Sequence, residues 1–117
     1  MGHRVLIALG SNYHQAVHLQ WAAQRLSAFV SNLQFSRTLW TEDVKGSGQM
    51  YMNQLAKGTT TYSRVKVEHL LKEAEMLSGR TKQQVTIDLD LMLYDDERHH
   101  LRDWPHPYIQ QLIDDVI

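Results

Sequence analysis

The 117-residue sequence predicts an α+β fold in which strands and helices follow the order β-α-β-β-α-β. Two observations carry this prediction. Residues 85–94 alternate strictly between apolar and other side chains, as in a strand with one face in a core. Two stretches, 13–30 and 63–79, repeat their apolar residues at helical spacing. Because crossovers are right-handed, this order gives a ferredoxin-like βαββαβ sandwich, a four-stranded antiparallel sheet with two helices on one face.

The first half of the chain predicts two strands around a helix. Residues 4–9, RVLIAL, are an apolar run rich in β-formers, as in a buried central strand. The following Gly10-Ser11-Asn12 is interpreted as a tight turn in which Ser11 or Asn12 caps a helix over 13–30. Residues 34–41 are aromatic and β-branched, which favours a second strand.

The second half repeats the pattern. A polar loop with two glycines, 42–49, leads into a third strand over 50–62. Ser63 is the predicted N-cap of the second helix and Gly79 its predicted end. After the alternating strand come a charged turn, an irregular run and a short C-terminal helix over 108–116. In the resulting sheet the first and last strands are neighbours, and loops and tail cover the second face only partly.

The composition narrows the class of protein. Hydrophobic residues make up 43% of the chain, which suits one compact domain over residues 1–117. The 12 basic and 13 acidic residues provide no basic field for nucleic acid. The sequence has no cysteine and no GxxxxGK[ST] motif, which excludes disulfides, thiolate metal sites and a P-loop. The apolar run Val5–Leu9 is too short for a signal peptide or membrane span, so we expect a soluble cytoplasmic protein.

Asp88 and Asp90 lie on one face of the alternating strand, with Cα atoms roughly 6.5–7 Å apart. Asp is depleted in strands, so two on one face suggest a function. Paired carboxylates bind hard divalent cations such as Mg²⁺, often together with a substrate's phosphates. The alternative is a solvated strand face with two unconnected acids, and this stretch alone leaves both interpretations open.

Asn53 and Tyr51 share one face of the third predicted strand, where Asn is disfavoured. The Asn amide could hydrogen-bond the donor and acceptor edge of a flat heterocycle, and the aromatic ring could supply stacking area. A polar residue on an open sheet face would explain Asn53 equally well.

Three arrangements of histidine are candidates for chemistry among the seven in the chain. His14 and His18 are spaced i, i+4 and could chelate a metal, although the sequence supplies no obvious third ligand. His99-His100 is expected on a loop surface. His106 stands between two prolines, whose stiff backbone could direct it to a phosphate.

Several short motifs, each weak alone, together resemble the hydroxymethyl-dihydropterin pyrophosphokinase family of the folate pathway. They occur in the family's order over about residues 3–108, and the family fold is the ferredoxin-like sandwich. The motifs are Ile7-Ala8-Leu9-Gly10-Ser11-Asn12, Thr41, Tyr51-Met52-Asn53, Glu75 with Gly79-Arg80, Thr86-Ile87-Asp88-Leu89-Asp90, and Pro105-His106.

This resemblance implies transfer of a pyrophosphoryl group from ATP to the hydroxymethyl group of a reduced pterin. By position, Asp88 and Asp90 would hold two Mg²⁺ across the triphosphate. The other matched residues divide between the two substrates: Asn53, Tyr51 and Thr41 beside the pterin, and Glu75, Arg80 and His106 beside the nucleotide.

The chain departs from the family pattern at three places. The loop before the Asp-bearing strand is shorter, lacks a Trp-Gly-Pro-Arg signature and has Val85 in place of an arginine. Lys82 is the cation left in that loop, so we expect it to supply catalytic charge. Residues 42–44 read Glu-Asp-Val where the family favours prolines. The chain also ends at Ile117, before a family segment with a pterin-stacking aromatic and an arginine, so we expect a minimal member.

Three hypotheses therefore enter the structural description. The first is a working pyrophosphokinase in which Lys82, Arg98 or Arg102 replaces the missing charge. The second is a weak or inactive relative that still binds a pterin or nucleotide. The third is a ferredoxin-like interaction module whose acids are incidental. The sequence leaves the oligomeric state open.

Overall fold

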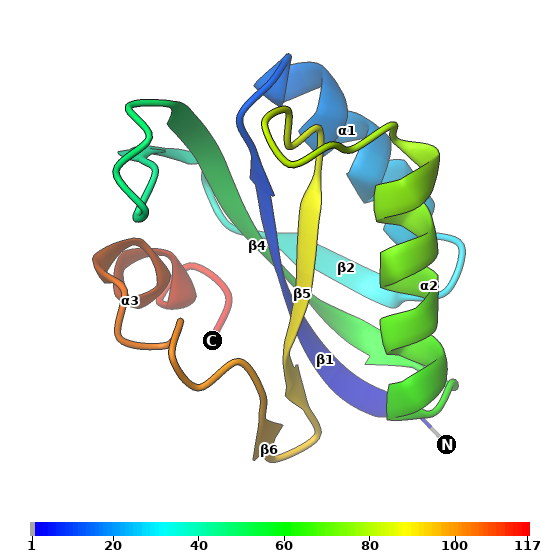
Figure 1. The fold of residues 1–117 in the computed structure, drawn as a ribbon. Coiled ribbons are helices and arrows are strands. Elements are labelled where there is room, and N and C mark those ends of the chain that lie inside the picture. The colour runs from blue at the N-terminus through cyan, green and yellow to red at the C-terminus, as the bar shows by residue number, and fades with distance from the viewer. Residues whose placement is uncertain (1) are drawn as a thin grey trace.

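A computed structural model describes residues 2–117 of the chain and shows a mixed α/β fold with one antiparallel sheet (Figure 1). The elements in chain order are β1 (His3–Ser11), α1 (Gln15–Leu26), β2 (Ser31–Phe35), β3 (Leu39–Glu42), β4 (Met50–Thr60), α2 (Arg64–Leu77), β5 (Asp88–Tyr94), β6 (Glu97–Arg98) and α3 (Pro107–Ile113). No helix among residues 2–117 is long and apolar enough to cross a membrane.

The sheet has six strands in the order β2-β4-β1-β5-β6, with β3 also pairing β4, so the predicted four-stranded sheet is wrong in strand number. One cause is Ser36, which divides the predicted strand 34–41 into β2 and β3. Its Oγ accepts a hydrogen bond from Leu55 N at 2.8 Å, where a continuous strand would offer a backbone carbonyl. The other cause is β6, a two-residue strand that pairs with the end of β5.

The first strand is central, as predicted. β1 pairs antiparallel with β4 on one side and with β5 on the other, which places the Asp-bearing strand next to it. Val5, Leu6 and Ile7 are each at most 1% exposed, so both faces of β1 are buried. This explains why the run RVLIAL does not alternate.

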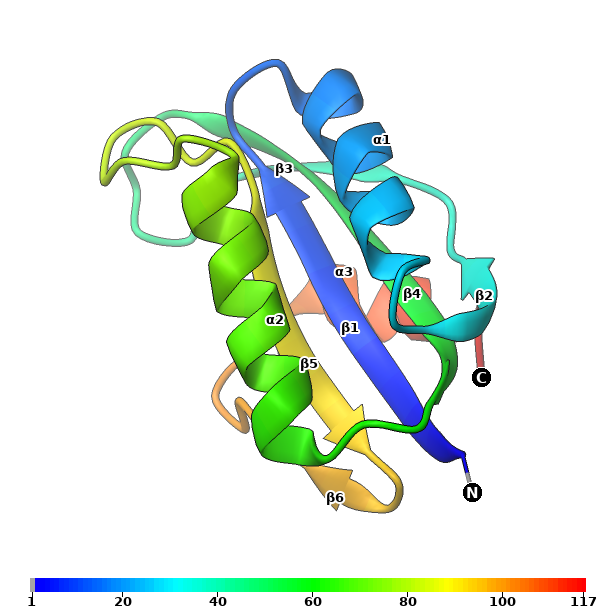
Figure 2. The same ribbon diagram turned by 90° about the vertical axis from the view of Figure 1, so that its right-hand side faces the viewer.

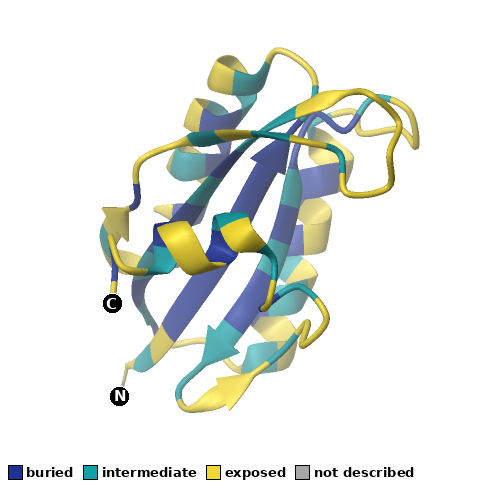
Figure 3. Ribbon diagram, turned by 90° about the vertical axis from the view of Figure 1, so that its left-hand side faces the viewer, coloured by how far each residue is buried: buried dark blue, intermediate teal, exposed yellow. Residues whose placement is uncertain are grey.

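Helices α1 and α2 lie side by side on one face of the sheet, and α3 lies on the other (Figures 1 and 2). The larger core fills the space under α1 and α2. A second, smaller core lies under α3, where helix and strand residues bury one another (Figure 3). Its buried members are Leu6, Leu55, Met92, Trp104, Ile109, Leu112 and Val116. The tail therefore covers part of the second face, and the rest is open near the start of β5.

A β-bulge interrupts the alternation of β5. Ile7 pairs with Leu91 and Leu6 with Leu93, so Met92 is the additional residue. Beyond the bulge, Leu93 packs in the core under α3 and Tyr94 packs in the core under α1 and α2. The predicted alternation over 85–94 is therefore wrong from Leu93 onward. It is also too long at its start, because the strand begins at Asp88.

The two long helices begin in different ways. Ser63 caps α2 as predicted, its Oγ accepting from Lys66 N at 3.2 Å. The predicted cap of the first helix by Ser11 or Asn12 is wrong: α1 has His14 at its N-cap, at φ 44°, without a side-chain hydrogen bond. Both residues are engaged with the segment before β5 instead, and α1 ends at Leu26 rather than Val30.

Candidate functional site

A cleft of about 690 Å³ opens on the second face of the sheet, beside α3. It forms where the C-terminal end of β1 lies next to the N-terminal ends of β4 and β5, because both neighbours run antiparallel to β1. Loops 42–49 and 80–85 and the segment before α3 complete its walls. The structure brings most of the candidate residues into this lining: Thr41, Tyr51, Asn53, Arg80, Lys82, Asp88, Asp90 and His106. Glu75 is the candidate that lies outside it.

Gly10 lies at the middle of the cleft floor. It pairs with Asn53 of β4 on one side and with Asp88 of β5 on the other, so the three residues form one row across the sheet. A Cβ at this position would lie 3.4 Å from Asn53 Oδ1 and 3.7 Å from Tyr51 Cδ2. Interpreting Gly10 as part of a tight turn is therefore wrong: it is a strand residue whose missing side chain leaves the floor open.

Asn53 is fixed in place by the neighbouring edge strand. Its side chain is buried, and Nδ2 donates to Leu39 O at 3.1 Å and to Thr41 Oγ1 at 2.8 Å. Because a carbonyl can only accept, Nδ2 must face Leu39, and Oδ1 is the atom that remains for a ligand's N–H. Thr41 therefore orients Asn53.

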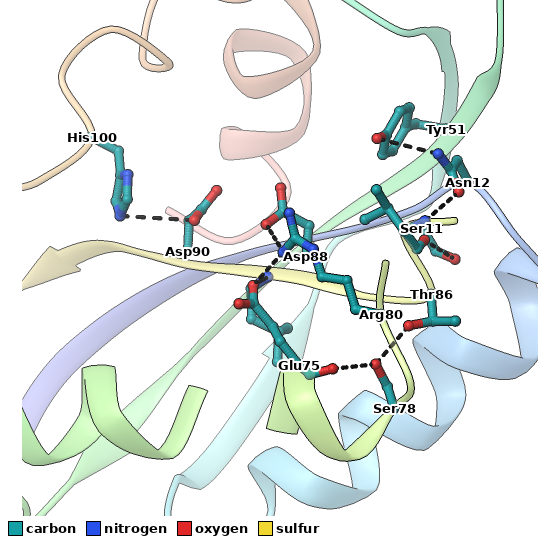
Figure 4. A network of polar contacts seen from close by, with 12 residues as sticks. Ser11, Asn12, Tyr51, Glu75, Ser78, Arg80, Thr86, Asp88, Asp90 and His100 are labelled. Carbon is teal, nitrogen blue, oxygen red and sulfur yellow. Dashed lines mark hydrogen bonds and ion pairs between the residues drawn. The ribbon is translucent and has the colours of Figure 1, made fainter. Parts of the chain in front are cut away.

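Arg80 and Asp88 form the charged wall of the cleft together with Glu75 below them (Figure 4). Arg80 Nη1 lies 2.9 Å from Asp88 Oδ1 and 3.0 Å from Glu75 Oε2. The same Glu75 oxygen accepts from Leu89 N at 2.8 Å, on the side of β5 that has no strand partner at this level. Burial raises the pKa of Glu75, and this backbone hydrogen bond opposes the rise. Glu75 thus joins α2 to β5 and positions Arg80.

Asp90 lies deeper than Asp88 in the same wall. Its side chain is 29% exposed, and no described residue donates a hydrogen bond to it. Burial, and then the neighbouring charge of Asp88, raise the pKa of the Asp90 carboxyl to about 6. Asp88 and Asp90 offer two carboxylates on one strand face, and no hydrogen bond within residues 2–117 compensates the charge of Asp90. This arrangement fits a hard divalent cation.

Asn12 lies just outside the lining of the cleft, and its contacts with the surrounding loops were not predicted. Its Oδ1 accepts from Val85 N at 2.8 Å, and its Nδ2 donates to Gln49 Oε1 at 2.8 Å and approaches Tyr51 OH at 3.4 Å. Gln49 Nε2 in turn donates to Gln83 O at 3.3 Å. Asn12 therefore ties the loops on either side of the cleft to the end of β1.

The cationic side chains of the cleft differ in whether they already form ion pairs. Arg80 is shared by two carboxylates, whereas Lys82 and Lys45 line the cleft and form no ion pair within residues 2–117. Of the other expected replacements, Arg98 stacks over the Trp104 ring at 4.3 Å, and Arg102 is exposed outside the lining. Lys82 and Lys45 are the cations available to an anionic ligand.

His106 stands at the rim, before the first turn of α3. Its Nε2 lies 3.5 Å from Asp103 Oδ1, and its ring stacks on Tyr108 with centroids 5.7 Å apart. Burial raises the pKa of Tyr108 to about 12, so its hydroxyl is a neutral hydrogen-bonding group in the cleft. Asp103 and Tyr108 were not predicted, because a short irregular segment carries no periodicity from which to place them.

The other histidines considered in the sequence lie at two places. His14 and His18 face each other at the start of α1, with ring centroids 6.4 Å apart and His18 Nδ1 2.6 Å from Tyr13 O. Of the expected surface pair His99-His100, His100 is exposed on a loop and its Nε2 lies 3.8 Å from Asp90 Oδ1, whereas the expectation is wrong for His99, whose side chain is 21% exposed and pairs with Glu97.

Comparison with known proteins gives one finding for this chain. A family model described as 7,8-dihydro-6-hydroxymethylpterin-pyrophosphokinase (HPPK) matches residues 6–112. The match runs from within β1 to within α3 and includes all the residues that line the cleft. No curated protein matches the chain.

Proposed function

The chain belongs to the HPPK family, and we propose that it transfers the pyrophosphoryl group of ATP to the hydroxymethyl group of a reduced pterin. The observation that carries this proposal is the row Asn53–Gly10–Asp88, which puts an amide and a carboxylate at opposite sides of one open floor. A flat heterocycle at Asn53 would then lie beside a triphosphate at Asp88 and Asp90.

The reaction joins the hydroxymethyl oxygen to the β-phosphorus of ATP and breaks the bond from that phosphorus to the α,β-bridging oxygen. AMP leaves with that oxygen, and the hydroxyl proton is released. Such transfers depend mainly on positioning and on neutralising phosphate charge. Asp88 and Asp90 would hold two Mg²⁺, which supply most of that neutralisation when bound.

The pterin would lie over Gly10. Asn53 Oδ1 is free to accept an N–H from the ring, because its amide nitrogen is occupied by Leu39 and Thr41. Tyr51 lines the same side and offers aromatic area against the ring. The absence of a side chain at Gly10 allows the ring to approach the sheet.

The nucleotide would occupy the other side. Lys82 would contact the phosphates directly, since it carries no ion pair within the described part of the chain. Arg80 would also contact the phosphates once bound cations compete with it for Asp88. His106 would contact them from the rim of the cleft. Glu75 would act through Arg80, as a positioning residue.

We also propose that residues 1–117 form one pyrophosphokinase-like domain of ferredoxin-like type and that the protein acts in the cytoplasm. The order β2-β4-β1-β5 of the four main strands, with α1 and α2 on one face, supports the fold type. The short β3 and β6 are then additions at the edges.

A second candidate function is binding without efficient transfer. The lining carries five carboxylates, Glu42, Asp43, Asp88, Asp90 and Asp103, against three cations, Lys45, Arg80 and Lys82. This excess of carboxylates favours a relative that still binds its substrates but lacks the positive charge needed for efficient transfer.

The test is AMP release from MgATP with and without 6-hydroxymethyl-7,8-dihydropterin, with Asp90→Ala beside the native protein. The proposal expects AMP that requires the pterin, Mg²⁺ and Asp90. Ligand-induced stabilisation without AMP would support the binding relative, whereas neither AMP nor stabilisation would contradict both candidates.

A further inference from the structure

Asp90 of β5 lies close to His100 and Asp103, which both belong to the segment between β6 and α3. One ligand atom from each lies within 4.8 Å of the others. We propose that these side chains bind a single transition-metal ion of the Zn²⁺ and Co²⁺ class.

The ligand atoms lie somewhat farther apart than in a coordination sphere, so binding an ion requires His100 to turn. His100 Nε2 lies 3.8 Å from Asp90 Oδ1 (Figure 4), and its Nδ1 lies 4.0 Å from Asp103 Oδ2. Around tetrahedral zinc, with bonds of about 2.0–2.2 Å, ligand atoms lie about 3.4 Å apart. The His100 side chain is 43% exposed, so it can turn to present one nitrogen to the ion without disturbing packed residues.

The local charge also calls for a cation. Asp90 is partly buried and receives no hydrogen bond from the described residues, while Asp88 and Asp103 add negative charge around it. His106 Nε2 lies 3.5 Å from Asp103 Oδ1, whereas His100 is near the other oxygen of that carboxylate, Oδ2. A bound ion would compensate Asp90 and Asp103 together.

The ligand set selects the class of ion. Carboxylate oxygens alone suit Mg²⁺, whereas an imidazole nitrogen among them favours zinc, cobalt and similar ions. This site is therefore distinct from a magnesium pair on Asp88 and Asp90, although it shares Asp90. The proposal does not depend on the pterin reaction. If that reaction is also correct, Zn²⁺ at this site competes with Mg²⁺ for Asp90 and inhibits it.

The chain supplies an internal control. His14 and His18 are neighbouring imidazoles at the start of α1. They have no carboxylate completing a three-residue cluster within residues 2–117. Adventitious binding to helical histidines would therefore depend on His18, and the proposed site would depend on His100.

The experiment is a Co²⁺ titration of the full chain, without nucleotide or pterin, followed by visible absorption, with melting temperatures recorded for each variant. We expect one saturable site from which Zn²⁺ displaces Co²⁺. His100→Ala and Asp103→Asn should each weaken it by more than about tenfold, and His18→Ala should leave it unchanged. Absence of saturable binding in the native protein, or equal affinity in folded His100→Ala, would overturn the proposal. Because the titration contains no substrate, its result is separate from that of the AMP assay.

Discussion

The two sides of the cleft are built in different ways. The amide side, consisting of Thr41, Tyr51 and Asn53, belongs to paired strands, and its key group is fixed by hydrogen bonds to the neighbouring strand. The carboxylate side, consisting of Arg80, Lys82, Asp88 and Asp90, belongs to β5 and the loop before it, and ion pairs hold only Arg80 and Asp88 in place.

This difference separates the proposed recognition of a neutral ring from the proposed binding of cations and phosphates. The amide side is neutral and needs no partner to reach its binding geometry, so it is already arranged for a rigid heterocycle. The carboxylate side contains charges that are incompletely compensated, above all Asp90, and so needs cations and phosphates to complete it. The proposed reaction requires both, and each can be tested by itself.

The largest expected effect follows from removing a carboxylate. Asp88→Ala should weaken Mg²⁺-dependent ATP binding by at least about tenfold and leave the melting temperature near its native value, because Asp88 is not part of either core. Calorimetric titration of ATP, with and without Mg²⁺, measures the effect. Native affinity for MgATP in this variant would remove the metal interpretation.

Asn53→Ala should damage the amide side. Loss of the ring contact predicts about tenfold weaker pterin binding, and loss of the donor to Leu39 O predicts about 1–3 kcal/mol lower stability. Thr41→Val removes only one anchor of Asn53, so it should weaken pterin binding less. Fluorescence titration with the reduced pterin and urea unfolding measure the two effects. An unchanged pterin affinity in Asn53→Ala would contradict the assignment.

Glu75→Ala should destabilise the carboxylate side of the cleft. It leaves the buried Leu89 N–H without an acceptor and removes one partner of Arg80, which predicts a loss of about 1–3 kcal/mol in unfolding free energy. Glu68→Ala is the matched control, because the Arg64–Glu68 pair is an exposed i,i+4 pair of about 0.3–0.5 kcal/mol. Equal effects in urea unfolding would show that Glu75 has no structural role beyond that of a surface acid.

A smaller effect concerns pH. The folded pKa of Asp90 is raised to about 6 from 3.8, so between these values the folded protein binds more protons than the unfolded chain. Stability contributed by this group therefore falls as pH rises from about 4 to 6. Asp90→Asn removes that dependence, so the variant should be the more stable protein at pH 7 without metal and lose its advantage near pH 4. A constant difference in melting temperature across this range would contradict the raised pKa.

The sequence predicted the residues on strands better than those on loops. Alternation placed Asp88 and Asp90 on one face, and that holds because both precede the bulge at Met92. The bulge itself left no trace in a run of apolar residues. Asn12 was interpreted as a local cap, and its actual partner is Val85, 73 positions away.

The position of His100 could not be predicted from the sequence pattern either. Its proximity to Asp90 depends on a loop that leaves β6 and folds back across the sheet, a path that no periodicity encodes. Ser36 is similar, because its role in dividing one predicted strand depends on Leu55 of another strand. Long-range polar contacts between irregular segments could not be predicted from the sequence pattern.

The most direct test of the two-sided cleft is a calorimetric titration of MgATP into Asn53→Ala. If the carboxylate side binds the nucleotide independently of the amide side, the variant should bind MgATP within about twofold of the native protein, since the hydrogen bonds of the Asn53 side chain within residues 2–117 go to Leu39 and Thr41 and not to the carboxylate side. A loss of MgATP affinity as large as that of Asp88→Ala would contradict the account.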